Sequence, residues 1–254
     1  MGEYRLSCSF LVLTKAWPTF LVLPIVLFGL IAPTSSHAAP ALLREITDSK
    51  QVVLVTAKSW NATTGTVRTF EKKNQTWTAT QSSTQANLGY GGLVSGKQRK
   101  QGTGKTPAGT YAIKWAFGIK PDPGASLKYT KVDSDDAWTY NPRVPSTYNV
   151  FQTSNKKWLS YGNYVERLTT YGKQYNYVAV LDFNLPEGKI TQGANGINRT
   201  DESANTARGG GIFLHVSNGK NTAGCIAVPQ KFMKNVLRWL DPKKNPVIVI
   251  RVNN

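Results

Sequence analysis

The amino-acid sequence predicts one mainly β domain with a few short helices. Short runs of β-branched and aromatic residues recur between clusters of Gly, Asn and Pro, which is typical of strands joined by turns. Apolar residues make up 40% of the 254-residue chain and charged residues 18%, so the chain can fill a core and is neither disordered nor collagen-like. Composition does not shift after the first 50 residues, which indicates a single domain over residues 51–253.

Eight segments are predicted to be strands, because each combines β-branched or aromatic residues with flanking turn residues. They are Gln51–Ala57, Thr66–Glu71, Trp77–Thr80, Thr110–Ala116, Tyr148–Phe151, Tyr177–Phe183, Gly211–Val216 and Val247–Val252. Tyr177–Phe183 and the run Ile212-Phe213-Leu214 are nearly continuously apolar, which favours strands inside the sheet.

One amphipathic helix is predicted directly after Pro229, a residue that favours the start of a helix. Its apolar face consists of residues at helical spacing, which are Phe232, Met233, Val236, Leu237 and Leu240. Asp241-Pro242 is expected to end it. A second, short helix is expected over Tyr164–Tyr171. Residues 120–145 and 186–211 are rich in Pro, Asp, Asn and Gly, and we expect long loops there that line or cover a site.

Residues 1–38 have the order of a secretory signal peptide, and residues 39–50 form a short segment before the domain. Arg5 and Lys15 precede an uncharged run, and the small residues that follow include Ser36-His37-Ala38, with cleavage expected after Ala38. An uncleaved membrane anchor is the alternative, since the uncharged run nearly reaches the length of a membrane span. In both cases we expect an exported protein that is periplasmic, wall-associated or extracellular.

Cleavage would leave one histidine and one cysteine in the mature chain, His215 and Cys225, because it removes His37 and Cys8. An unpaired cysteine in an exported protein needs an explanation. A thiol of ordinary pKa is mostly protonated near neutral pH and needs an adjacent base to become a nucleophile. The alternative is that both residues are structural, but their separation by only ten positions favours a catalytic pair.

Other motifs are better explained as turns. Gly91–Gln98 approaches a phosphate-binding loop, but Gln98 stands where Ser or Thr is needed, and Gly104-Lys105-Thr106 is followed directly by proline. Asp133–Asp136 lacks the Gly and the closing Glu of a calcium loop. These segments therefore indicate neither a phosphate-binding loop nor a calcium loop.

The chain is strongly basic, with 31 Lys and Arg against 14 Asp and Glu and a formal net charge of +17. These residues are spread along the chain and no nucleic-acid-binding motif accompanies them, so we do not expect nucleic acid as a partner. Retention on an anionic surface requires no motif. The acidic polymers of a cell wall are the expected surface, and a basic surface without a partner is the alternative.

Three segments together resemble a known enzyme family. They are Gly104-Lys105-Thr106-Pro107-Ala108-Gly109-Thr110-Tyr111, Phe213-Leu214-His215 and Thr222-Ala223-Gly224-Cys225-Ile226. A histidine, a spacer and Ser/Thr-x-Gly-Cys mark the YkuD-type L,D-transpeptidases, which this chain resembles from about Gln51 to Val252. The resemblance implies a mainly β, β-sandwich-like catalytic domain that acts on the stem peptides of peptidoglycan with no metal and no organic cofactor.

The resemblance also implies the roles of the site residues. Cys225 would attack the stem peptide and form a thioester, His215 would activate the thiol, and Thr222, Ala223 and Gly224 would shape the oxyanion side through backbone amides. An amine of a second stem peptide would resolve the thioester into a 3→3 crosslink, and carbapenem-type β-lactams would be inhibitors.

Three departures from the family pattern and two rival functions accompany this assignment. The spacing of ten residues from His215 to Cys225 is shorter than is usual in the family. Ala223 replaces a more common histidine, and Ala227 replaces an arginine that often follows the cysteine. An L,D-carboxypeptidase on the same site is one rival function, and a non-catalytic wall-binding module is the other.

The export hypothesis predicts the N-terminus of the mature protein. Because the small-residue site precedes Ala39, N-terminal sequencing of the secreted or wall-associated protein should begin at or next to Ala39. A full-length cytoplasmic protein as the main product would contradict the hypothesis.

Overall fold

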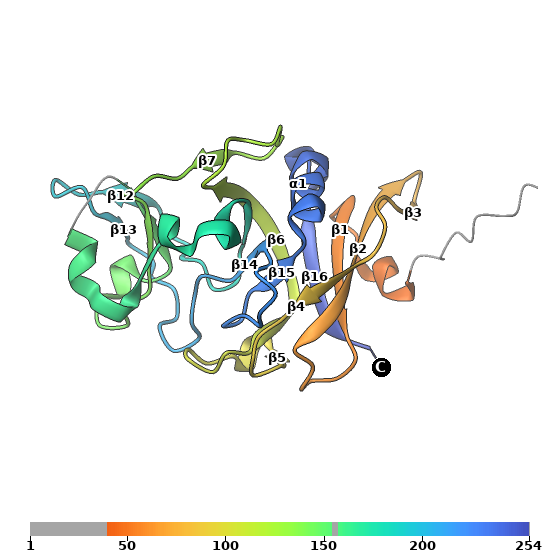
Figure 1. The fold of residues 1–254 in the computed structure, drawn as a ribbon, viewed down its shortest axis with the longest axis horizontal. Helices are drawn as coiled ribbons and strands as arrows, with labels where there is room; N and C mark the ends of the chain where they lie inside the picture. Colours follow the sequence, from red (N-terminus) through yellow and green to blue (C-terminus); the bar gives the residue numbers. More distant parts are fainter. Residues whose placement is uncertain (1–39, 154–156, 254) are drawn as a thin grey trace, which may run out of the picture. The chain divides into compact units, whose positions relative to one another are not determined.

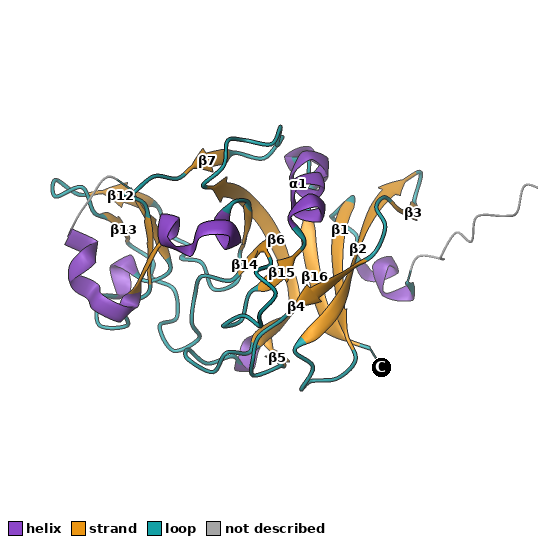
Figure 2. Ribbon diagram, in the orientation of Figure 1, coloured by secondary structure: helices purple, strands orange, loops and turns teal. Residues whose placement is uncertain are grey.

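The computed structural model describes residues 40–153 and 157–253, and the predicted signal peptide of residues 1–38 lies outside them. Strands predominate (Figure 2). In the part of the chain that is described, no helix combines the length and the apolar character needed to cross a membrane.

The strands are β1 (Gln51–Ala57), β2 (Thr64–Lys73), β3 (Thr76–Ala79), β4 (Thr84–Asn87), β5 (Leu93–Ser95), β6 (Thr106–Gly118), β7 (Tyr129–Lys131), β8 (Ala137–Thr139), β9 (Val150–Gln152), β10 (Val165–Arg167), β11 (Val178–Leu181), β12 (Ile190–Gln192), β13 (Asn198–Thr200), β14 (Phe213–Val216), β15 (Ile226–Val228) and β16 (Val247–Val252). The α-helix is α1 (Gln230–Trp239), and the 3₁₀ helices are η1 (Ala41–Glu45), η2 (Gly96–Gln98), η3 (Pro145–Thr147), η4 (Lys157–Tyr164), η5 (Leu168–Tyr175) and η6 (Pro242–Lys244). Each of the eight predicted strands overlaps one of these strands.

The main sheet has the order β1-β16-β6-β11-β14-β15-β4-β2-β3, and it closes on itself because β1 also pairs with β2 (Figure 1). Closure gives β1 a hydrogen-bonded neighbour on both sides, so it has no open edge. Two walls of the same sheet thus face each other across one core. The predicted mainly β, sandwich-like class is confirmed.

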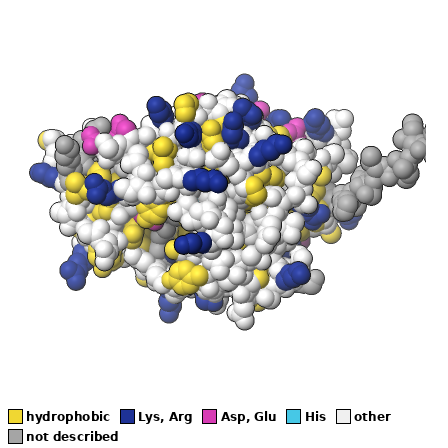
Figure 3. Space-filling model, viewed as in Figure 1, with side chains coloured by type: hydrophobic (Ala, Val, Ile, Leu, Met, Phe, Trp, Pro, Cys, Tyr) yellow, Lys and Arg dark blue, Asp and Glu magenta, His cyan; other side chains and the backbone are white. Residues whose placement is uncertain are grey.

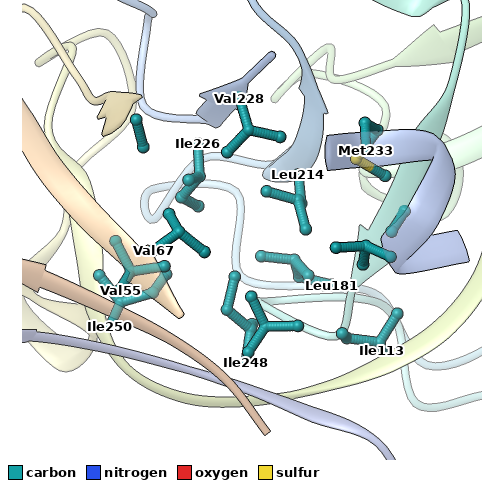
Figure 4. Close-up of a cluster of buried hydrophobic side chains, with 14 of the residues drawn as sticks. Val55, Val67, Ile113, Leu181, Leu214, Ile226, Val228, Met233, Ile248 and Ile250 are labelled. Carbon is teal, nitrogen blue, oxygen red and sulfur yellow. The ribbon is translucent and has the colours of Figure 1, made fainter. Parts of the chain in front are cut away.

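The core lies inside this closed sheet and beneath α1. Figure 4 shows side chains from several strands pointing toward one another, among them Val55, Leu214, Ile226 and Ile248, with Met233 of α1 beside them. Alternation along β14 directs Leu214 and Val216 into this cluster and Phe213 into a second cluster on the other face. One strand therefore belongs to two packed layers.

The predicted helix after Pro229 is confirmed as α1, with Pro229 as its N-cap residue rather than its first helical residue. Its predicted apolar face is buried, and the 3₁₀ helix η6 follows at Pro242. The apolar face covers the core that the strands leave open.

The predicted helix over Tyr164–Tyr171 is only half right. Its first half contains the strand β10, which pairs with β8, whereas Leu168–Tyr171 belongs to the 3₁₀ helix η5. Gly162 (φ 58°) and Gly172 (φ 54°) interrupt the 3₁₀ helices η4 and η5, because a left-handed backbone cannot continue a right-handed helix. The two expected loops also contain strands, β7 and β8 in the first and the hairpin of β12 and β13 in the second.

Candidate active site

The pairing of β14 with β15 places the two predicted catalytic residues. The strands are parallel, with Leu214 opposite Ile226 and His215 opposite Ala227. Ser217–Cys225 connects them, which is shorter than the dozen or so residues that a parallel connection usually needs. Cys225 is therefore the last residue of this connection, at the start of β15.

His215 and Cys225 lie on the same face of this strand pair. Continuing the register places Cys225 opposite Phe213, and the Phe213 amide donates a hydrogen bond to the Cys225 sulfur at 3.4 Å. Residues two apart share a face, so Phe213, His215 and Cys225 project to the side away from the main core. Cys225 and His215 are thus diagonal neighbours across the strand pair, since two residues along a strand span about 6–7 Å.

The His215 ring is fixed by its own strand. Its Nδ1 lies 2.9 Å from the Val216 carbonyl oxygen, which only accepts, so Nδ1 carries the proton and Nε2 is the unprotonated nitrogen of the neutral ring. Burial lowers the pKa of His215 to about 4, although the carbonyls of Val216 and Gln174 act to raise it. The imidazole is therefore neutral at physiological pH.

The Cys225 thiol is half-buried and donates a hydrogen bond to the Gly211 carbonyl at 3.2 Å. Burial raises the pKa of Cys225 to about 12, and the charge of Glu166 acts in the same direction. The Phe213 amide and the Arg99 guanidinium oppose this rise in pKa. In the resting site both members of the pair are thus uncharged.

In the described structure no hydrogen bond joins the Cys225 sulfur to the His215 ring. The thiol proton is directed at Gly211 instead. Catalytic hydrogen bonds are often formed only when substrate binds, so this geometry is compatible with the predicted catalytic pair. The arrangement suits proton transfer from thiol to imidazole during attack, rather than a preformed thiolate–imidazolium pair.

Thr222, Ala223 and Gly224 form the turn that presents Cys225. The Thr222 hydroxyl donates to the Cys225 carbonyl at 2.6 Å and accepts from the Gly224 amide at 3.1 Å. Ala223 is exposed, and its carbonyl accepts from Arg99 at 3.5 Å. Gly224 has φ +136° and leaves no room for a Cβ against the Lys105 carbonyl. The oxyanion role of these residues stays a prediction, since the Gly224 amide is occupied by Thr222 here.

Arg99 is a further site residue that the sequence analysis missed. It is buried, and its guanidinium donates to the carbonyls of Lys105 at 3.0 Å, Arg208 at 2.6 Å and Ala223 at 3.5 Å. These bonds tie three distant segments together beside the nucleophile. Ala227, where the family often has arginine, lies buried opposite His215, so the cation near Cys225 comes from another part of the chain.

The Gly104–Tyr111 segment forms a neighbouring wall of the site. Its Lys105 carbonyl holds Arg99, and the Thr106 hydroxyl accepts from the Gly89 amide at 2.8 Å. Gly89 in turn pairs with Thr222 of the cysteine turn. The three segments of the family resemblance are thereby brought together, although they are far apart in the sequence.

Asn149 fixes the position of Gly211, whose carbonyl accepts the hydrogen bond from the Cys225 thiol. Its side-chain oxygen accepts from the Gly211 amide at 2.8 Å and from the Trp138 indole at 2.7 Å. Asn149 is buried at φ 61°, a left-handed conformation that Asn tolerates better than most residues. This network fixes the segment that enters β14.

Tyr175 and Glu166 complete the surroundings of the pair. The Tyr175 ring packs edge-on against His215, with ring centroids 5.7 Å apart. Its hydroxyl donates to Glu166 Oε2 at 2.7 Å. No local sequence signal pointed to either residue, because the predicted helix over Tyr164–Tyr171 placed Glu166 on a helix surface.

Among the described residues, no three His, Cys, Asp or Glu side chains are grouped as a metal site would need. The Asp133–Asp136 segment is a turn, in which the Asp136 carboxylate accepts from the Asp133 amide at 2.9 Å.

Comparison with known proteins assigns the fold to a family. The model of the YkuD L,D-transpeptidase catalytic domain matches residues 49–249. No match was found among curated proteins or among solved structures. The matched range contains all the site residues described above.

The neutral resting pair predicts how the thiol reacts with a small alkylating reagent. Because the pKa of Cys225 is about 12, the rate of iodoacetamide alkylation should keep rising, about tenfold per pH unit, from pH 7 to pH 10. In protein unfolded in urea the thiol has an ordinary pKa of about 8.5, so its alkylation rate should level off within this pH range. A plateau in the folded protein would show that the thiol ionises readily.

The variant Arg99→Met tests whether the guanidinium lowers the pKa of Cys225. Loss of the guanidinium should raise the pKa of Cys225 further and slow alkylation at every pH in the range. Lys97→Met, which removes an exposed cation nearby in the sequence, is the control and should react like the parent.

Proposed function

The chain belongs to the YkuD L,D-transpeptidase catalytic-domain family, and on that premise we propose that it is an exported cysteine transpeptidase that crosslinks peptidoglycan stem peptides. The family implies peptidoglycan as the substrate class. The observation that carries the finer proposal is the half-buried Cys225 thiol on the same strand face as a neutral His215. This is the arrangement that nucleophilic attack assisted by a general base requires.

In the first half-reaction the donor tetrapeptide acylates Cys225. The thiol proton moves to Nε2 of His215 as Sγ attacks the carbonyl of the third, L-centred residue. The C–N bond to the terminal D-Ala breaks, and the His215 imidazolium gives its proton to the departing amine. The products are a thioester on Cys225, free D-Ala and a neutral imidazole.

In the second half-reaction an amine of a neighbouring stem peptide attacks the thioester. A C–N bond forms, the C–S bond breaks, and the sulfur regains a proton to restore the thiol. The new amide joins two third residues and is a 3→3 crosslink. Water in place of the amine would make the protein an L,D-carboxypeptidase.

The Cys225 turn supports the charge that develops on the carbonyl oxygen. Backbone amides of the turn are the donors that we assign to this oxyanion, and Arg99 lies beside them through its bond to Ala223. The Gly224 amide becomes available when its hydrogen bond to the Thr222 hydroxyl breaks. The Thr222 hydroxyl then keeps the Cys225 carbonyl as its partner.

Carbapenem acylation tests the nucleophile. The strained β-lactam carbonyl stands in for the scissile amide, so intact-protein mass should rise by one drug molecule in the parent. Cys225→Ala should show no adduct, and His215→Ala should form it roughly 10²–10⁴-fold more slowly, the usual contribution of a positioned acid–base group. Cys225→Ser should fail as well, because a hydroxyl ionises much less readily than a thiol.

The same assay, followed by product analysis, separates the transpeptidase from the rival functions. A wall-binding module without catalysis predicts no adduct in any variant and altered thermal stability as the main effect of changing Cys225. Equal rates for His215→Ala and the parent would contradict the catalytic pair. Mass spectrometry after incubation with a disaccharide tetrapeptide then distinguishes crosslinked dimers from the tripeptide that a carboxypeptidase would release.

We further propose that electrostatics retain the protein on the anionic wall. Figure 3 shows Lys and Arg distributed over the viewed face among few acidic side chains, in keeping with the formal net charge of +17. Distributed charge of this kind attracts a polyanion without a specific pocket.

Wall retention should depend steeply on salt. Exposed charges are screened beyond about 8 Å at physiological ionic strength and over shorter distances as salt increases. Cosedimentation with purified cell walls should therefore decline strongly with added NaCl. Binding that does not respond to salt would indicate a specific pocket instead.

A further inference from the structure

A carboxylate without a cationic partner lies next to the catalytic pair. Glu166 is the central residue of β10 and is half-buried. Within residues 40–153 and 157–253 the ion pairs are those of Glu71 with Lys73 and Lys244, so no cation neutralises Glu166. Partial burial of an unpaired carboxylate is unfavourable, so its retention calls for an explanation beyond stability.

The small sheet of β8, β9 and β10 directs Glu166 toward the site. Glu166 pairs with Trp138, so the two side chains share one face of this sheet. Trp138 packs edge-on against Phe213, with centroids 4.9 Å apart, and Phe213 lies on the strand face that carries His215 and Cys225. Glu166 therefore faces the layer in which the reaction takes place.

Glu166 is linked to both members of the pair. Tyr175, which donates to its carboxylate, covers the His215 ring. The position that a Cβ would take on Gly211 is 3.8 Å from Glu166 Oε1, and the Gly211 carbonyl accepts the Cys225 thiol proton. Gly211 therefore lies between the Glu166 carboxylate and the Cys225 thiol.

A surface cavity lies next to Glu166, on the face of β10 that carries its neighbours Val165 and Arg167. A cavity of about 230 Å³ is lined by Val165, Arg167, Thr170, Tyr171 and Gln174. Tyr171 stacks on Tyr175 with centroids 4.6 Å apart, and the Gln174 carbonyl acts on His215. Glu166 is itself partly exposed, so a small acceptor can reach its carboxylate, while Arg99 lies on the side of the Cys225 turn.

We propose that Glu166 binds the amine of the acceptor substrate and takes a proton from it, so that the amine can attack the thioester on Cys225. The inference rests on the proposed transpeptidase function and assigns its second half-reaction. The acceptor amine arrives as an ammonium ion, which has no lone pair and is attracted to a carboxylate. One N–H proton passes to Glu166, and the neutral amine then forms the C–N bond as the C–S bond breaks. A second N–H proton passes to the departing sulfur, which restores the thiol, and Glu166 releases its proton to solvent.

The electrostatics of the site are suited to this transfer. Burial raises the pKa of Glu166 to about 7, and the Tyr175 hydrogen bond acts to lower it. The titratable groups that face the carboxylate are Tyr140, Tyr171, Tyr175 and Cys225, all neutral near pH 7. A half-buried ammonium–carboxylate pair is poorly solvated, which favours proton transfer to the neutral amine and acid.

The test compares two acceptors on the acyl-enzyme formed with a disaccharide tetrapeptide. Nα-acetyl-L-lysine offers an amine that is protonated at neutral pH, whereas methoxyamine is already unprotonated. Glu166→Gln should reduce transfer to acetyl-lysine by about 10²-fold or more, the contribution of a general base, and change methoxyamine transfer only a few-fold. Glu45→Gln removes an exposed acid from η1 and is the matched control, with parent rates for both acceptors.

The outcomes separate this proposal from the proposed function. Equal transfer to acetyl-lysine by parent and Glu166→Gln, or equal losses with both acceptors, would overturn the role of Glu166 while leaving the transpeptidase intact. A parent protein that forms no acyl-enzyme would overturn the transpeptidase function and this role with it. Acylation itself should not slow in Glu166→Gln, because loss of the negative charge lowers the pKa of Cys225.

Tyr175→Phe provides a second readout if Glu166→Gln folds poorly. The ring against His215 is kept, but the hydrogen bond that lowers the pKa of Glu166 is lost, so that pKa should rise. The rise of acetyl-lysine transfer with pH, expected near pH 7 in the parent, should move to higher pH. An unchanged profile would contradict a role for the carboxylate.

Discussion

The parallel pairing of β14 with β15 is the constraint on which the site depends. Its register aligns Cys225 with Phe213 and places His215 two residues further along the same face. The short Ser217–Cys225 connection has to return beside the strand that it leaves, so its last turn is tightly bonded through Thr222. A shift of one residue in this register would direct Cys225 into the apolar core, because successive side chains alternate between faces.

Two charged residues, Arg99 and Glu166, lie on two sides of Cys225. Arg99 is held by three carbonyls on the side of the Cys225 turn, and Glu166 is held by Tyr175 on the side of His215. The cation lowers the pKa of the thiol and the carboxylate raises it, while burial outweighs both. The two substrates of a transpeptidase also differ in charge, since the donor ends in a carboxylate and the acceptor presents an amine.

The parts that depend on local patterns could be predicted from the sequence. The order of apolar residues after Pro229 predicted α1, and the chemistry of a lone thiol and imidazole pointed to Cys225 and His215, whose proximity the strand register explains. Arg99 and Glu166 could not be predicted, because each reaches the site through pairings between distant segments. The helix expected at Tyr164–Tyr171 was wrong over its first half because edge pairing with β8 determines the conformation of β10, and spacing within the segment does not reveal a partner.

The hydrogen bond from the Cys225 thiol to the Gly211 carbonyl has a consequence for the durability of the protein. Oxidants and disulfides react with the thiolate, so a cysteine that keeps its proton is oxidised slowly. The bond, together with burial, holds Cys225 in this protected form. In the oxidising environment that the proposed export implies, the Cys225 thiol would therefore persist in its reduced form.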